Sequence, residues 1–336
     1  MVNGQRKISL GTLVVFALVA AFVLIVPSVT SGYSMMIVNL SLIYAIATYG
    51  LSVMLGMGGM LSFAAVSFMG GGAYWVANLC TGRLGVSMEP WLALLLAPVV
   101  FAVVGFIIGS ILLKLNGTYF TFATIALVQV AWCLFQNYRP LFGGPDGISG
   151  IATLEMFGLK ITSYTQWFYV LAAITLIVAL LVERIRRTQL GRSLAAIRDN
   201  QTAAQILGVD VYHTKVIAFT IAAALGALSG ALYCLQGRFV SSDMFTFERA
   251  TQFIIMAMLG GVNDTFGIFL GSVLITVLPE SLRVLQKYLK IVYGTAIILL
   301  MIFMPMGIMG AIKDGFKKMR RKKREALMNV AREVKP

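Results

Sequence analysis

The run WLALLLAPVVFAVVGFIIGSILL, from Trp91 to Leu113, contains 23 residues and no charged side chain. A helix needs about 20 apolar residues to cross the hydrocarbon core of a bilayer, so this run predicts a transmembrane helix. Similar runs recur along the 336 residues, of which 59% are hydrophobic and 12% charged, and the mean hydropathy is +0.88. A soluble globule of this size needs more polar surface. The sequence therefore predicts an all-α polytopic membrane protein.

About ten transmembrane or re-entrant helices follow from the lengths of the apolar runs. They are predicted at roughly 8–26, 36–55, 60–79, 91–113, 119–136, 167–182, 215–236, 251–262, 265–282 and 291–309. The third, eighth and ninth are short or rich in glycine, and such segments are tolerated in a bilayer only where protein or a water-filled cavity covers the backbone. We expect a transmembrane permease domain over 1–310, with the translocation pathway near these segments, and a basic cytoplasmic tail over 311–336.

The basic residues predict the orientation of the chain. The net charge is +14, and 18 of the 27 lysines and arginines lie in three segments beside predicted spans. Basic residues accumulate on the cytoplasmic side of membrane proteins. Ten crossings with both termini in the cytoplasm place 19 basic residues inside and eight outside. This distribution indicates orientation and contact with lipid headgroups, not binding of nucleic acid.

One long polar segment, ERIRRTQLGRSLAAIRDNQTAAQILGVDVYHTK, interrupts the apolar runs between Glu183 and Lys215. Its small and apolar residues recur at helical spacing, Asp199 or Asn200 can cap a second helix, and Gly208 can end it. The pattern predicts two short helices with a polar connection between them, which would suit docking of a cytosolic partner. A plain basic loop beside the membrane is the alternative.

Residues that could carry catalysis are scarce. His213 is the only histidine, the three cysteines lie far apart in apolar runs, and no Gly-Lys pair forms a nucleotide-binding loop. No catalytic, cofactor-binding or metal-binding residue is therefore predicted. Ionisable residues are nearly absent from the interiors of the spans, which argues against a proton-coupled carrier. Energy for transport would have to come from another chain.

Glycines and one glutamine are the candidates for a pathway. The turns LGMGGMLSF (Leu55 to Phe63) and LGGVNDTF (Leu259 to Phe266) resemble each other and are predicted to lie on the same side. Gln129 is the most polar residue within a strong span, where it can line a pathway or bond a neighbouring helix. The residues taken as lining a pathway or packing helices are Gly58, Gly59, Gln129, Gly260 and Gly261.

Two further glycine patterns concern packing and an outer loop. Three small-xxx-small pairs, Gly105/Gly109, Gly226/Gly230 and Gly267/Gly271, predict close helix contacts within the chain or a dimer interface. The longest predicted outer loop contains LFGGPDGISGI, a turn-forming sequence. It can be an ordered loop, or a contact for an extracytoplasmic binding protein through Gly143, Gly144, Pro145, Asp146 and Gly147.

The chain resembles the permeases of branched-chain amino acid ABC transporters, of the LivM type. The resemblance rests on the ordered stretches GTYFTFATIALVQV (Gly117 to Val130), GGPDGISGI (Gly143 to Ile151), Gly191 to Phe247, Met256 to Arg283 and Tyr293 to Gly310. It covers about 110–310, with looser similarity from Asn39 to Tyr74. The family commonly has a Thr-Gly-Tyr-Gly-like sequence and a Gly-His pair where this chain has LGMGGM (Leu55 to Met60) and SFAA (Ser62 to Ala65), so substrate contacts are not carried over there.

The resemblance implies a bacterial inner-membrane subunit that imports leucine, isoleucine and valine. It would pair with a homologous permease of the LivH type, bind two cytoplasmic ABC ATPases and receive substrate from a periplasmic binding protein. The ATPase-coupling residues implied are Gly191, Arg192, Ala195, Arg198, Asp199, Ala203, Ala204 and Gly208. The alternatives are a permease for urea or short amides, a carrier or channel acting alone, and a membrane scaffold without a transport role.

Overall fold

The computed structural model describes residues 27, 30, 32–83, 85, 87–115, 117–156, 159–281, 294–295, 298, 307 and 309–310. The predicted span at 8–26, most of that at 291–309 and the basic tail lie outside the described residues. The longer helices, in chain order, are α2 (Tyr33–Ser52), α3 (Ala65–Thr81), α4 (Pro90–Leu112), α5 (Thr118–Asn137), α7 (Tyr164–Arg187), α8 (Gln189–Asp199), α10 (Val211–Gly237), α11 (Phe247–Gly260) and α12 (Thr265–Ser281). The short elements are a π-helix at Val53–Met57, α6 (Arg139–Phe142), α9 (Gln201–Ile206), 3₁₀ turns at Gly144–Asp146 and Ser242–Met244, and strands β1 (Ile148–Ser149), β2 (Glu155–Met156), β3 (Leu159–Lys160) and β4 (Phe239–Val240).

Five of the described helices are long and apolar enough to cross a membrane. They are α2 with its π-helical extension, α4, α5, α7 and α10, and they match the strong predicted spans. The three segments predicted to be weak form helices of 17, 14 and 17 residues, which are α3, α11 and α12. At about 1.5 Å of rise per residue these three are shorter than the hydrocarbon core. The short helix α3 is almost entirely covered by protein. Cover is needed there because its glycines have no side chains to shield the backbone polar groups from lipid.

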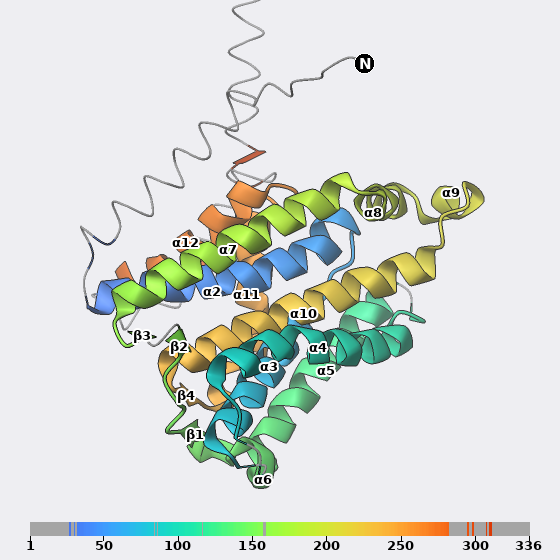
Figure 1. Cartoon of the computed structure of the whole chain (residues 1–336). Coiled ribbons are helices and arrows are strands. Elements are labelled where there is room, and N and C mark those ends of the chain that lie inside the picture. Colours follow the sequence, from blue (N-terminus) through green and yellow to red (C-terminus); the bar gives the residue numbers. More distant parts are fainter. Residues whose placement is uncertain are drawn as a thin grey trace, which may run out of the picture.

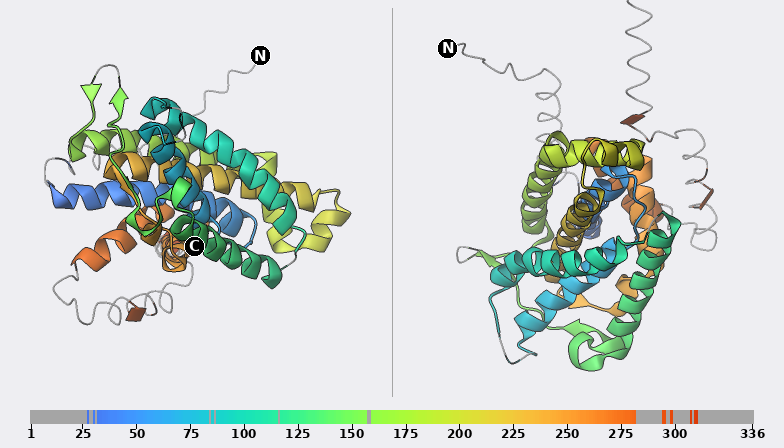
Figure 2. Two further views of the ribbon diagram at one scale, coloured as in Figure 1. Left: turned by 90° about the horizontal axis from the view of Figure 1, so that it is seen from below. Right: turned by 90° about the vertical axis from the view of Figure 1, so that its right-hand side faces the viewer.

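The described helices form two layers. One layer contains α2, α7, α11 and α12, and the other contains α3, α4, α5 and α10; α10 also packs on α2 and so joins the layers (Figure 1, Figure 2). The α8–α9 hairpin links α7 of the first layer to α10 of the second, at one end of the bundle. We call this the hairpin end. The turn after α2 and the turn between α11 and α12 also lie there, in contact with Arg198 of α8.

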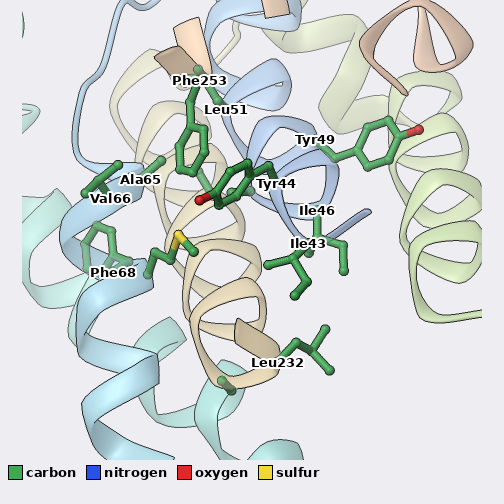
Figure 3. Close-up of a cluster of buried hydrophobic side chains, with 14 of the residues drawn as sticks. Ile43, Tyr44, Ile46, Tyr49, Leu51, Ala65, Val66, Phe68, Leu232 and Phe253 are labelled. Carbon is green, nitrogen blue, oxygen red and sulfur yellow. The ribbon is translucent and has the colours of Figure 1, made fainter. Parts of the chain in front are cut away.

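The central helix of the bundle is α2, and its burial distinguishes it from the peripheral spans. In the most apolar 18-residue stretch of α2 and its π-helical extension 89% is buried, against 28% in the corresponding stretch of α4. Tyr44 of α2 packs against Phe253 of α11, with 5.3 Å between ring centroids (Figure 3). The guanidinium of Arg249 lies 5.1 Å from the centroid of the Tyr44 ring. Cation–π attraction of this kind lets a charged side chain near a span end pack against the core.

The prediction of tight packing at the small-xxx-small pairs is confirmed within the chain. A Cβ on Gly109 of α4 would lie 2.8 Å from Cδ1 of Phe219 in α10. A Cβ on Gly230 of α10 would overlap the Met69 carbonyl of α3, and one on Gly267 of α12 would overlap the Gly260 carbonyl of α11. Helix backbones approach this closely only where glycine leaves the space empty.

Candidate functional site

The polar segment between α7 and α10 forms a helical hairpin, as predicted. Asn200 lies between α8 and α9, and its side chain accepts a hydrogen bond of 3.0 Å from the amide of Ala203. Gly208 follows α9 with φ +84°, a conformation that glycine adopts without strain. Asp210 then caps α10 by accepting a hydrogen bond from the His213 amide at 3.0 Å. Each turn of the hairpin is therefore held by a short polar contact.

A small apolar cluster holds the hairpin together. Ile197, Ala204 and Val211 pack on one another and are at most 5% exposed. A Cβ on Gly191 would overlap the carbonyls of Ile185 and Arg186, so this glycine allows α8 to fold back on α7. Gly191 and Ala204, two of the residues implied as ATPase-coupling, are thus interior residues that shape the hairpin. The others of that set are exposed, except that Ala195 is half-buried; they are Arg192, Arg198, Asp199, Ala203 and Gly208.

Two large apolar side chains project from the tip of the hairpin. Ile206 ends α9 and Leu207 follows it, and each is 81% exposed. The exposed apolar residues of α4 and α5 lie in long apolar helices, whereas these two lie in a polar segment outside any predicted span. The two side chains are adjacent in the chain and form a small exposed apolar patch at the tip of the hairpin. They belong to the small and apolar residues that recur at helical spacing in this segment, and the ATPase-coupling residues implied by the resemblance do not include them.

The glycine turns predicted near the pathway meet the hairpin. Arg198 Nη1 donates a hydrogen bond of 2.8 Å to the Gly56 carbonyl. Gly58 packs against Leu194 of α8, and a Cβ on Gly59 would lie 2.6 Å from Arg198 Cγ. In the second turn, Gly260 packs against the backbone of Gly267 of α12 and Gly261 against that of Gly307. All four glycines of the predicted set therefore occupy packing positions at the hairpin end.

A polar network beside these turns was missed by sequence reasoning. Glu183 near the end of α7 pairs with Arg186 at 2.8 Å, and both bond the hydroxyl of Thr265, the first residue of α12. The hydroxyl of Tyr49 in α2 donates to the Thr265 carbonyl at 3.0 Å. The network ties three helices of one layer together. Its sequence signal was Glu183 and Arg186 at i and i+3, and Thr265 lies too far along the chain to be linked to them.

Gln129 lies on an exposed face of α5. The exposed residues Phe122, Ala126, Gln129, Cys133 and Asn137 recur every three or four positions and share one stripe of the helix. The described residues offer no hydrogen bond to the Gln129 side chain, so the predicted bond to a neighbouring helix does not form within this part of the chain. The exposed residues of α4 from Leu95 to Ile107, in contrast, are all apolar.

A cavity of about 440 Å³ lies between α3, α4 and α5, and most of its lining is apolar. Phe101, Leu127 and Phe135 line it, and none of the five candidate pathway residues does. The lining also includes Tyr74 and Asn78 of α3. We therefore place the Gln129 stripe outside this cavity.

The predicted outer loop is compact and lies at the opposite end of the bundle from the hairpin. Ile148 and Ser149 of β1 pair antiparallel with Val240 and Phe239 of β4, the strand that follows α10. A Cβ on Gly147 would overlap the Val240 carbonyl, and Gly144 is buried. Pro145 and Asp146 form the exposed tip.

Comparison with known proteins places these features in a family. Residues 33–305 match the family model described as branched-chain amino acid transport system / permease component. The LivM permease protein of the high-affinity branched-chain amino acid transport system of Salmonella typhimurium is 31% identical over 87% of this chain and 73% of that protein. The Escherichia coli LivM protein is 30% identical over 89% and 76%, and a probable LivM of Methanocaldococcus jannaschii is 29% identical over 58% and 57%. No solved structure matches the chain significantly. The chain belongs to the family of branched-chain amino acid transport system permease components.

Proposed function

We propose that the chain is the transmembrane subunit of an ATP-driven importer of leucine, isoleucine and valine in a bacterial inner membrane. The names of the LivM relatives support this substrate class. Permeases for L-arabinose and for autoinducer 2 also match about half of the chain. Because related permeases serve such different cargoes, we assign the choice of substrate to a separate periplasmic binding protein.

The observation that carries the proposal is the pair Ile206 and Leu207, each 81% exposed at the tip of the α8–α9 hairpin. Burying a side chain of this size in a partner stabilises a complex by about 1.5–3 kcal/mol. In the proposal the pair enters a groove on a cytoplasmic ABC ATPase, with Ala203 and Gly208 beside it and Arg192 at the rim. A second ATPase serves the partner permease.

The proposal assigns two other surfaces to partners. The α5 stripe around Gln129 faces the homologous permease, so that the pathway runs between the two subunits. An amide left facing lipid costs free energy, which supports covering it with protein or water.

The exposed tip at Pro145 and Asp146 meets the periplasmic binding protein, since it lies at the end opposite the hairpin. ATP-driven closure of the ATPases then moves the two hairpins and switches the pathway between inward and outward openings.

The docking role of Ile206 and Leu207 is tested by replacing both with serine in the assembled transporter. We expect co-purification of the ATPase to fall by about tenfold or more, because at least one anchor of about 1.5–3 kcal/mol is lost. The matched control is Leu115→Ser, which removes an exposed leucine (44%) from the α4–α5 turn at the same end of the bundle. Undiminished ATPase binding by the double variant would show that the tip is not the docking surface.

A further inference from the structure

Arg198 links α8 by a hydrogen bond to the turn after α2, 142 positions earlier in the chain. Its Nη1 donates to the Gly56 carbonyl at 2.8 Å, while Nε and Nη2 face Asp199 Oδ1 at 3.3 and 3.2 Å. The side chain is 35% exposed. A guanidinium held between a carboxylate and a backbone carbonyl makes charge-assisted hydrogen bonds, which are stronger than neutral ones.

Asn263, in the turn between α11 and α12, completes this contact. We assign the orientation of its amide from its neighbours, because only the nitrogen can donate to the Gly56 carbonyl, at 2.6 Å, and only the oxygen can accept from Arg198 Nη1, at 3.0 Å. One carbonyl thus receives donors from two segments that lie far apart in the sequence. We call Gly56, Arg198 and Asn263 the joint.

The backbone around the joint is shaped to admit these partners. A Cβ on Gly56 would overlap the Val262 carbonyl, and Gly59, at φ +66°, leaves room for the stem of Arg198. Gly56 also lies within the π-helix at Val53–Met57. Single π-helical turns are rare and are found mostly at functional positions, because they change the direction and register of a helix end.

The joint connects the hairpin to one layer of the bundle. Gly56 follows α2, and Asn263 lies between α11 and α12, all of which belong to the layer that also contains α7. The other half of the hairpin is tied to the second layer, since Gln201 of α9 accepts a hydrogen bond of 2.8 Å from Lys215 of α10. A displacement applied at the tip of α9 therefore acts between the two layers.

From this arrangement we propose that Arg198 is a positioning residue that transmits movement of the coupling hairpin to the ends of α2 and of the α11–α12 pair. This inference rests on the proposed function. It gives Arg198 a role different from docking: its guanidinium faces the bundle, and the ATPase contacts the tip at Ile206 and Leu207.

The test uses the assembled transporter in proteoliposomes with Arg198→Ala. We expect the ATPase to co-purify as with the unmodified chain, while the amount of leucine imported per ATP hydrolysed falls about tenfold, as for loss of a hydrogen bond to a charged group. Arg184→Ala is the matched control, because it removes one exposed arginine from the last turns of α7 outside the joint. Its import per ATP should stay unchanged.

A double variant separates the joint from a general loss of charge. Arg198 and Asn263 act through the same carbonyl, so Arg198→Ala with Asn263→Ala should lose no more import per ATP than Arg198→Ala alone. Additive losses, or wild-type import per ATP by Arg198→Ala, would overturn the inference. So would a fall in ATPase co-purification that matches the fall in import, because Arg198 would then be a docking residue.

The proposed function and the joint fail in different ways. If no ATPase co-purifies with the unmodified chain, the proposed function is wrong. The joint is then judged by thermal unfolding of the permease alone, where the shifts in midpoint of Arg198→Ala and Asn263→Ala should be non-additive. Strictly additive shifts would contradict the joint itself.

Discussion

At the scale of single residues, glycine sets how closely neighbouring helices and turns approach within each layer. The carbonyl that would meet a Cβ belongs to a neighbouring helix at Gly230 and at Gly267, and to the turn between α11 and α12 at Gly56. The sequence predicts the close contacts at Gly230 and Gly267, because each glycine is paired with another four residues away within an apolar run. The sequence could not predict the partner of Gly56, because Val262 lies more than two hundred positions away and only the folded chain brings the two turns together.

Gly230→Ala should destabilise the bundle, since the new Cβ would overlap the Met69 carbonyl of α3. Overpacking of this kind costs about 1–3 kcal/mol, which exceeds the gain of about 1 kcal/mol from replacing glycine by alanine inside a helix. Gly237→Ala, at the end of the same helix with nothing within 4 Å of its Cβ, is the control. Thermal unfolding in detergent should show a lower midpoint for the first variant and an unchanged or higher one for the second. Equal midpoints would mean that α3 and α10 can move apart freely.

At the scale of elements, the strong spans and the hairpin were predictable, and the short helices were predictable as short. Long apolar runs such as Trp91 to Leu113 predict a membrane-spanning helix, because their length matches the thickness of the hydrocarbon core. The α8–α9 hairpin followed from cap residues, and Asn200 proved to be the cap. The face that each residue presents was not predictable: Ala204 turns inward and Ile206 outward, because tertiary contacts with Ile197 and Val211 decide how α9 is rotated.

Asp210→Ala should loosen the start of α10, because Asp210 accepts hydrogen bonds from the His213 amide and from the His213 ring at 2.7 Å. Amide hydrogen exchange in the first turn of α10 should become faster, while Asp210→Asn, which can still cap a helix, should retain protection. If the alanine variant exchanges at the wild-type rate, the cap does not stabilise this turn.

The same cap predicts a dependence on pH. The hydrogen bond donated by the His213 backbone amide, followed by the hydrogen bond from the His213 side chain, lowers the pKa of the Asp210 carboxyl below its usual value. A carboxyl with a lowered pKa in the folded state contributes stability above its unfolded value of about 3.9, and that contribution is lost as pH falls through the folded pKa. The backbone amides in the first turn of α10 should therefore stay equally protected against hydrogen exchange between about pH 5 and pH 8. A loss of protection near neutral pH would contradict this assignment.

At the scale of the whole molecule, segments predicted to share one side do lie together. The turn after α2, the turn between α11 and α12, and the hairpin meet at the joint, and the Tyr212 hydroxyl bonds the Ser110 carbonyl of α4 at 2.6 Å beside them. At the other end, Asn78 of α3 bonds the Leu141 carbonyl of the outer loop. Charge counting and alternation of spans could predict this relative sidedness. They could not show that the helices separate into two layers with the hairpin between them.

The exposed faces of α4 and α5 give the last prediction, because the two helices differ in what they present. Val103 of α4 is 59% exposed among apolar neighbours, as suits contact with lipid, whereas Gln129 lies on the α5 stripe that we assign to the second permease. A tryptophan at position 129 would obstruct that interface at a cost of about 1–3 kcal/mol, or about tenfold in association, whereas a tryptophan at 103 would meet only lipid. Co-purification of the homologous permease should therefore fall with Gln129→Trp and persist with Val103→Trp. Equal association of both variants would place the α5 stripe in lipid and would require the pathway to run elsewhere.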